Sequence, residues 1–111
     1  MNTLSTHVLD TMHGRPAAGL AVVLSGADGE IARGTTNQDG RCPDLAPAEL
    51  APGRYALRFA VADYFRRLGV ALPDPPFLDE VTVDFGIGAE GGHYHVPLLV
   101  SPYGYSTYRG S

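Results

Sequence analysis

Large apolar side chains recur at every second position along much of this chain, and this period of two is the strongest constraint on its fold. Across residues 54–62 the apolar set alternates with arginine and alanine, as in a strand that is buried on one face. The same alternation predicts strands at about residues 4–11, 20–24, 30–35, 81–85, 93–100 and 103–108. Turn-forming sequences separate these segments, since 14 Gly and 9 Pro are spread through 111 residues.

One segment, residues 63–69, lacks the alternation. It begins with Asp63, whose carboxylate suits a helix N-cap, and ends with Gly69, which suits a C-cap. These signals predict a helix of about two turns. Seven or eight short strands and one small helix predict an all-β fold, an antiparallel β-sandwich.

The length of the chain limits how it can build a site. A folded chain of 111 residues hides about two-thirds of the surface that its unfolded form exposes, which is enough for one hydrophobic core. We therefore expect a single domain over residues 1–111. We also expect any large active site to be shared between subunits.

Charge and apolar runs exclude several classes of partner. The net charge is −4, and all eight basic residues are arginines scattered along the chain, which argues against a nucleic-acid partner. No apolar run approaches the roughly 20 residues of a membrane-spanning helix, and the first residues show no secretory signal. A single cysteine, Cys42, excludes an internal disulfide. Together these features predict a cytoplasmic protein with no membrane partner.

Two local features need an explanation. Residues 86–91 have the G-x-G-x-x-G spacing of a dinucleotide-binding motif, but an alternating strand follows them in place of the helix that would hold the pyrophosphate. We interpret them as a glycine-rich hairpin loop. Pro97 lies inside the predicted strand 93–100 and cannot donate a ladder hydrogen bond, so we expect a bulge or a nitrogen without a partner strand.

Three histidines are candidates for chemistry. His93 and His95 lie two residues apart on a predicted strand and therefore project from one face, opposite its apolar residues. His7, on the first predicted strand, shares a face with Ser5 and Leu9. The residues alone allow a metal site, an acid–base or nucleophilic group, or a solvated surface.

Three other residues carry weaker signals. Arg41 follows a tight turn, so it is either a clamp for an anion or a carbonyl, or an ordinary surface arginine. Cys42 is better explained as a small buried residue than as a nucleophile. His13 lies in a Gly/Pro turn and is interpreted as solvated.

The C-terminal residues 101–111 are unusual because they contain three of the six tyrosines. Tyrosine is large and amphipathic, so such an end is not expected to extend freely into solvent. It predicts either an edge strand of the sandwich or a segment docked at an interface or over a ligand site.

Residues 4–10, Leu-Ser-Thr-His-Val-Leu-Asp, and residues 93–99, His-Tyr-His-Val-Pro-Leu-Leu, together with the terminal Tyr-Arg-Gly-Ser, carry a resemblance. The chain resembles the transthyretin-like family and, within it, the 5-hydroxyisourate hydrolases. The resemblance implies a sandwich of two four-stranded sheets with one short helix. It also implies a homotetramer with active sites at the dimer–dimer interface, and no metal or other cofactor.

The same resemblance assigns roles to individual residues. It implies catalytic roles for His7, Arg41 and His95, and substrate contacts for His7, Arg41, Tyr108 and Ser111. It implies that 5-hydroxyisourate is hydrolysed at a ring amide to 2-oxo-4-hydroxy-4-carboxy-5-ureidoimidazoline, during conversion of urate to allantoin.

These residue types suit the opening of a cyclic amide. A neutral imidazole, with a usual pKa of about 6.5, can accept a proton from water near pH 7, and either His95 or His7 can have this role. Arg41 supplies a permanent positive charge for the developing oxyanion. The alternatives are a non-catalytic carrier of a small aromatic ligand, a histidine metal site, and a hydrolase that uses Cys42.

Overall fold

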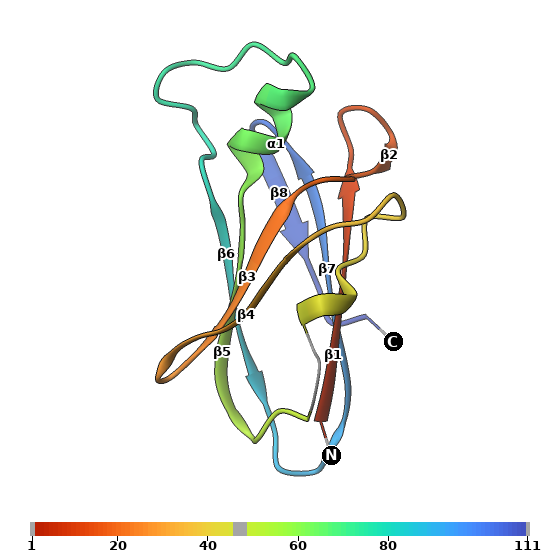
Figure 1. Ribbon diagram of the computed structural model, residues 1–111, viewed down its shortest axis with the longest axis vertical. Helices are drawn as coiled ribbons and strands as arrows, with labels where there is room; N and C mark the ends of the chain where they lie inside the picture. The colour runs from red at the N-terminus through yellow and green to blue at the C-terminus, as the bar shows by residue number, and fades with distance from the viewer. Residues whose placement is uncertain (1, 46–48, 111) are drawn as a thin grey trace.

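A computed structural model describes residues 2–45 and 49–110 as eight strands and two short helices (Figure 1). In chain order the strands are β1 (Asn2–Asp10), β2 (Arg15–Pro16), β3 (Ala21–Gly26), β4 (Gly29–Thr35), β5 (Gly53–Phe59), β6 (Val81–Ile87), β7 (Gly92–Ser101) and β8 (Gly104–Thr107). The helices are a 3₁₀ turn at Pro43–Leu45 and α1 (Val61–Arg67).

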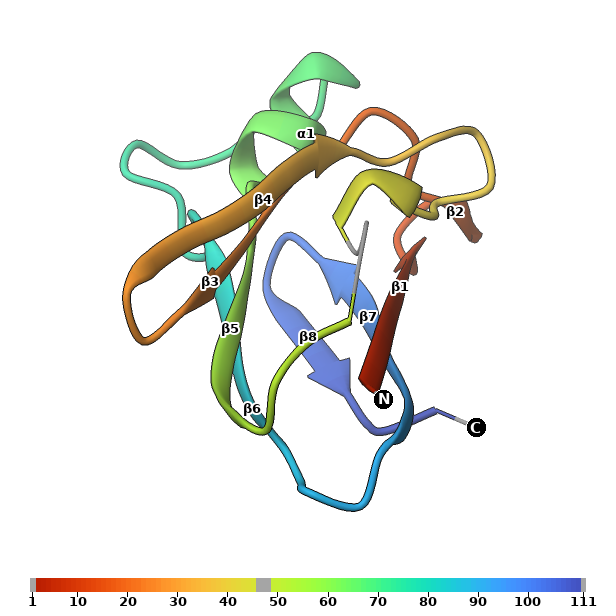
Figure 2. The same cartoon turned by 60° about the horizontal axis from the view of Figure 1, so that its bottom comes forward.

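The strands form two sheets that face each other, as Figure 2 shows. One sheet has the order β2-β1-β7-β8 and the other has the order β4-β3-β5-β6. This arrangement confirms the predicted all-β sandwich of two four-stranded sheets with one short α-helix. All the pairs are antiparallel except β1 and β7, which run parallel over nine paired positions.

The core lies between the sheets and is built from the alternating side chains. Along β1 every second residue from Asn2 to Asp10 is buried, and the residues between them are exposed or half-buried. The same alternation in β7 places Val96, Leu98 and Val100 in the core. The period of two therefore divides these two strands into an inner face that packs and an outer face that is free for other roles.

The N-cap of helix α1 lies three residues earlier than the sequence predicts. The N-cap is Ala60, and Asp63 lies inside the first turn, so the predicted N-cap at Asp63 is wrong. Burial explains the difference, because Val61, Ala62, Tyr64 and Phe65 all pack into the end of the sandwich. The residue predicted to end the helix, Gly69, has the positive φ of 83° that suits a glycine there. In the part of the chain that the structure describes, no helix is both long and apolar enough to cross a membrane.

The glycine-rich segment after β6 is not a hairpin loop, so that interpretation is wrong. Strand β6 continues to Ile87, and the next strand, β7, belongs to the opposite sheet. The segment therefore crosses between the two sheets. Local alternation gives no information about which sheet a strand joins.

Pro97 lies where the pairing between β7 and β8 stops. The last paired position is Leu98 with Thr107, and the Thr107 hydroxyl donates to the Pro97 carbonyl at 2.7 Å. The nitrogen of Pro97 lies on the same edge of β7 as its carbonyl. Because the pairing with β8 has already ended at this position, the absence of an N–H on Pro97 removes no hydrogen bond from the ladder. Of the two expected arrangements, the structure shows the nitrogen without a ladder partner.

The C-terminal end of β1 is anchored to α1 by a buried carboxylate. Asp10 is fully buried and accepts hydrogen bonds from the Tyr64 hydroxyl at 2.7 Å and from the His13 backbone at 2.9 Å. Its other close contact is the His13 ring, whose Nδ1 lies 2.6 Å from Oδ2, so His13 is bonded rather than merely solvated. Burial raises the pKa of Asp10, but the bonds from Tyr64 and His13 outweigh it and hold the pKa below its ordinary 3.8.

Candidate functional site

The parallel pairing of β1 and β7 brings the candidate residues together on the outer face of their sheet. Ser5 pairs with His95, His7 with Pro97, and Thr3 with His93. Paired residues in a sheet point to the same side, so three of the four histidines share this face. We use "outer face" below for the side of the β2-β1-β7-β8 sheet that is turned away from the core.

His95 is a partly enclosed titratable group on the outer face. Its ring is half-buried, and its Nδ1 lies 2.7 Å from the Ser5 hydroxyl, which leaves Nε2 as the nitrogen available to a ligand. Burial lowers the pKa of His95 below its usual 6.5, and the nearby charges of Arg41, His7 and His93 act in the same direction. His95 is therefore neutral near pH 7 and able to accept a proton.

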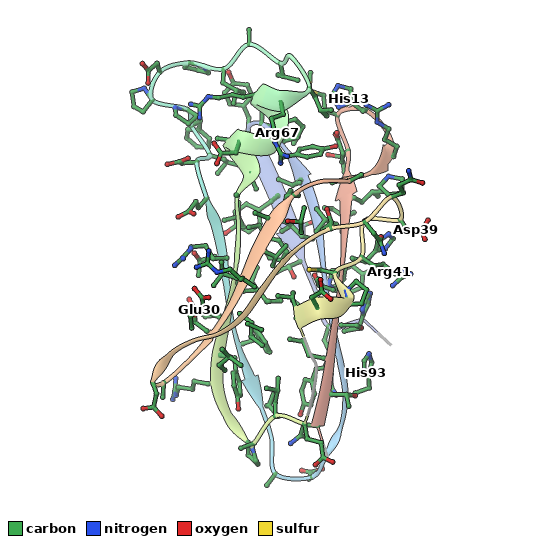
Figure 3. All side chains as sticks on the ribbon, viewed as in Figure 1. His13, Glu30, Asp39, Arg41, Arg67 and His93 are labelled. Atoms are coloured by element: carbon green, nitrogen blue, oxygen red, sulfur yellow. The ribbon has the colours of Figure 1, made fainter. Side chains whose placement is uncertain are left out.

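Arg41 reaches the outer face from the loop after β4. The side chain of Asn37 shapes this loop, since its Oδ1 accepts hydrogen bonds from the backbone N–H of Asp39 at 3.0 Å and of Arg41 at 3.1 Å. The backbone of Asn37 in turn donates to the Arg41 carbonyl at 2.8 Å. These bonds fix the backbone from which the exposed guanidinium extends. Figure 3 shows Arg41 and His93 on the same side of the molecule, along β1.

The Arg41 loop is joined directly to β1 beside His7. Arg41 and His7 form an isolated antiparallel bridge, and the Val8 N–H donates to the Gly40 carbonyl at 2.8 Å. Gly40 has a φ of 76°, and a Cβ there would overlap the carbonyl oxygen of Val8 and lie 3.3 Å from the His7 ring. The close approach of loop and strand therefore depends on glycine at this position.

The C-terminal segment returns to the sheet at His95. The Gly110 N–H donates to the His95 carbonyl at 2.8 Å. A Cβ at Gly110 would lie 2.5 Å from Cδ2 of the His95 imidazole and 3.1 Å from Cγ. Any side chain at this position must displace the ring, so Gly110 sets where the imidazole can lie.

Tyr108 and Ser111 were the other predicted contacts. Tyr108 directly follows the end of β8, and its side chain is 60% exposed. Ser111 lies outside the described residues.

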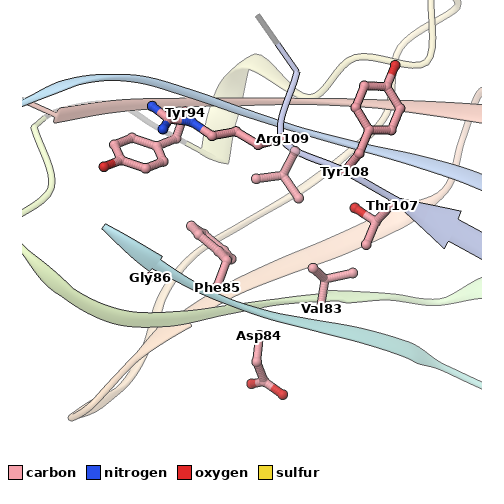
Figure 4. A pocket seen from close by; sticks show the side chains of 9 residues that line it. Val83, Asp84, Phe85, Gly86, Tyr94, Thr107, Tyr108 and Arg109 are labelled. Atoms are coloured by element: carbon pink, nitrogen blue, oxygen red, sulfur yellow. The ribbon is translucent and has the colours of Figure 1, made fainter. Parts of the chain in front are cut away.

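A cavity of about 390 Å³ lies on the inner side of this segment, at the open edge of the sandwich (Figure 4). Its lining includes Phe85, Tyr94 and Arg109, and the Arg109 guanidinium stacks 4.1 Å above the Tyr94 ring. Tyr108 also contributes to this lining, although its ring points away from Phe85 and Val83 in Figure 4. The lining contains none of His7, Arg41 and His95, so this cavity is separate from these three residues.

The structure bears on two of the alternatives, a nucleophilic Cys42 and a histidine metal site. Cys42 is buried, and this burial, with the negative charge of Asp44, raises the pKa of its thiol. A buried, protonated thiol is a poor nucleophile, which agrees with the interpretation of Cys42 as a small core residue. Among residues 2–45 and 49–110, no group of three or more His, Cys, Asp or Glu side chains is placed to hold a metal ion.

The outer face thus combines a neutral imidazole with a second imidazole and a permanent cation. Such a set can remove a proton from water and stabilise negative charge that develops on a bound carbonyl. Sequence reasoning did not identify the residues that shape it, which are Ser5, Asn37, Gly40 and Gly110. The period of two placed Ser5 on the face of His7, but its partner across 90 residues of chain was not visible.

Comparisons with known proteins identify the family of this chain. The family model described as "Transthyretin: HIUase/Transthyretin family" matches residues 4–110. A 5-hydroxyisourate hydrolase of Mesorhizobium japonicum is 56% identical to this chain, over 97% of this chain and 91% of that protein.

Two solved structures show the same fold. The 5-hydroxyisourate hydrolase of Klebsiella pneumoniae has a TM-score of 0.87 and 40% identity, covering 98% of this chain and 99% of that one. Sea bream transthyretin in complex with thyroxine has a TM-score of 0.84 and 30% identity, covering 97% and 94%. The chain belongs to the HIUase/Transthyretin family.

Proposed function

We propose that this chain hydrolyses 5-hydroxyisourate on the outer face, using His7, Arg41 and His95. The reaction opens a ring amide and gives 2-oxo-4-hydroxy-4-carboxy-5-ureidoimidazoline, a step in the conversion of urate to allantoin. The observation that carries the proposal is the half-buried His95 ring, which is held neutral beside the Arg41 guanidinium. The names of the related hydrolases support the choice of substrate.

In this mechanism His95 is the general base. Ser5 fixes its Nδ1, so Nε2 takes the proton from the attacking water. Arg41 stabilises the oxyanion that forms when water adds to the ring carbonyl, and it cannot lose its charge. His7 orients the water and returns a proton to the leaving nitrogen, while Tyr108 and Ser111 contact the substrate.

We further propose that the active form is a homotetramer with its sites at the dimer–dimer interface. The outer face of one chain is open, and it carries the half-buried apolar pair Leu9 and Leu99 next to the histidines. A facing copy would cover these leucines and enclose the substrate. A cytoplasmic location remains a prediction.

Hydrolysis is tested with freshly generated 5-hydroxyisourate. The wild-type protein should accelerate its decay, whereas the His95→Ala variant should lose about 100-fold or more in kcat because it lacks the general base. Circular dichroism checks that the variant is folded, and His13→Gln, a histidine change away from the outer face, should retain activity within twofold. A His95→Ala protein with turnover within twofold of wild type contradicts the assignment, and a wild-type protein that binds but does not hydrolyse the substrate would be a carrier.

The shared site is tested at Leu99. A Leu99→Arg substitution places a charge on the half-buried apolar part of the outer face, so it should separate the tetramer into dimers and lower kcat/KM more than tenfold. Analytical ultracentrifugation and the decay assay measure the two effects. Leu68→Arg, at a leucine that is 41% exposed after α1, is the control and should change neither. A wild-type protein that is monomeric and fully active at the same concentration would overturn the shared site.

The protonation of His95 is tested by following its ring proton by NMR during a pH titration. The midpoint should lie below 6.5, because burial and neighbouring positive charge oppose protonation. Arg41→Gln removes one of those charges and should raise the midpoint above the wild-type value. Arg58→Gln, on β5 in the other sheet, should leave it unchanged. A midpoint at or above 6.5 in the wild-type protein would contradict the described environment.

The placement of the His95 ring is tested by Gly110→Ala. The added methyl group overlaps the imidazole, so kcat should fall about tenfold or more, as misplacement by about 1 Å is enough to cost 100-fold in other enzymes. Gly104→Ala is the matched control, because a Cβ added at Gly104 would come no closer than 3.9 Å to its nearest neighbouring atom, the Ser101 hydroxyl oxygen. Equal activity of the two variants would show that the contact at Gly110 does not position the ring.

A further inference from the structure

His93 has no role in the mechanism above, yet both of its ring nitrogens are engaged. Its Nδ1 lies 2.6 Å from the Thr3 hydroxyl, and its Nε2 lies 2.8 Å from the Ser5 hydroxyl. The same Ser5 oxygen lies 2.7 Å from Nδ1 of His95. Thr3, His93, Ser5 and His95 therefore form one continuous chain of hydrogen bonds across β1 and β7.

The chemistry of Ser5 couples the two rings. A serine hydroxyl has one proton, so Ser5 can donate to only one of the two imidazoles and must accept from the other. If it donates to Nε2 of His93, it accepts from Nδ1–H of His95, and Nε2 of His95 is then a free base. The proton on Nδ1 of His93 is donated to the Thr3 oxygen in this arrangement. The tautomers of the two rings are thus linked through the single hydroxyl proton of Ser5.

We propose that Ser5 and His93 form a proton relay that carries the proton taken up by His95 to the exposed edge of the site, with Thr3 holding the tautomer of His93. Water gives a proton to Nε2 of His95, the Nδ1 proton of His95 passes to Ser5, and the Ser5 hydroxyl proton passes to Nε2 of His93. The result is one neutral His95 and one positively charged His93. The proton on His93 is then released to solvent, while the leaving nitrogen receives its proton through His7. This inference rests on the proposed hydrolysis.

The surroundings of the two rings favour movement of the charge in this direction. His95 is half-buried and is affected by the charges of Arg41, from its loop, and of His7, on β1. His93 is exposed at the end of β7, where solvent stabilises an imidazolium. Arg109 donates a hydrogen bond to the backbone carbonyl of His93 at 3.4 Å and does not contact the His93 ring. The Arg109 guanidinium stacks on the ring of Tyr94, which lies on the other face of β7. Moving the proton to His93 therefore takes the positive charge away from the positively charged Arg41.

The relay is tested by measuring kcat in mixtures of H₂O and D₂O. When several protons move together, the plot of kcat against deuterium fraction is curved, whereas a single moving proton gives a straight line. The wild-type plot should be curved. Ser5→Ala should give a straight line with kcat about tenfold lower and KM within threefold, and Ser5→Thr, which keeps the hydroxyl, should restore the curvature. His93→Gln, which cannot hold the charge, should resemble Ser5→Ala.

Two outcomes would overturn the relay. One is a straight line for the wild-type protein, and the other is a Ser5→Ala variant that keeps the curved plot or has kcat within twofold of wild type. A residue that only holds the His95 ring in place would lower kcat without changing the form of the plot.

A second measurement does not depend on turnover. In protein labelled with ¹⁵N-histidine, Ser5→Ala should change the ¹⁵N chemical shifts of the ring nitrogens of both His93 and His95. Thr3→Val should change the chemical shifts of His93 strongly and, through Ser5, those of His95 more weakly. If Ser5→Ala shifts one ring and leaves the other unchanged, the coupling is absent and the relay is wrong. A wild-type protein that fails to hydrolyse 5-hydroxyisourate would contradict the proposed function, and the NMR result would still decide whether the two rings are coupled.

Discussion

The parallel pairing of β1 with β7 is the contact on which both the fold and the site depend. It joins the first strand to the last long strand over nine paired positions, from Asn2 with Gly92 to Asp10 with Val100. Because side chains alternate along a strand, a shift of one residue in this register would move the core residues of one strand outward. It would also separate Ser5 from His95. Stability and chemistry therefore require the same register, and the buried inner face enforces it.

Much of the architecture could be predicted from the sequence because its period of two is local. It predicted every strand except the two-residue β2, the inner and outer faces of β1 and β7, and the position of His7 on the face of Ser5. The helix start was placed at Asp63 because a capping residue is visible in sequence, whereas the burial of Val61 depends on the other sheet. The hairpin at residues 86–91 was wrong for the same reason, since sheet membership is a long-range property.

The candidate site residues could be named in advance, but the contacts that connect them could not. The resemblance supplied His7, Arg41 and His95, and the structure places them on one surface. The hydrogen bonds of Ser5 to two histidine rings span about 90 residues of chain, so no local pattern could reveal them. The role of Gly110 was equally hidden, because a missing side chain becomes informative only when the neighbouring imidazole is in place.

The alternation along β1 and β7 gives this fold a simple way to change its ligand. Even-numbered residues of β1, and those of β7 from Val96 onward, are buried in the core, whereas odd-numbered residues other than the buried Pro97 are exposed or half-buried on the outer face. Substitutions at odd positions can therefore alter what is bound or transformed with little effect on packing. Sea bream transthyretin, crystallised with thyroxine, keeps the fold at a TM-score of 0.84 with 30% identity. In such a scaffold, selection for a new ligand and selection for stability act on different residues of the same strand.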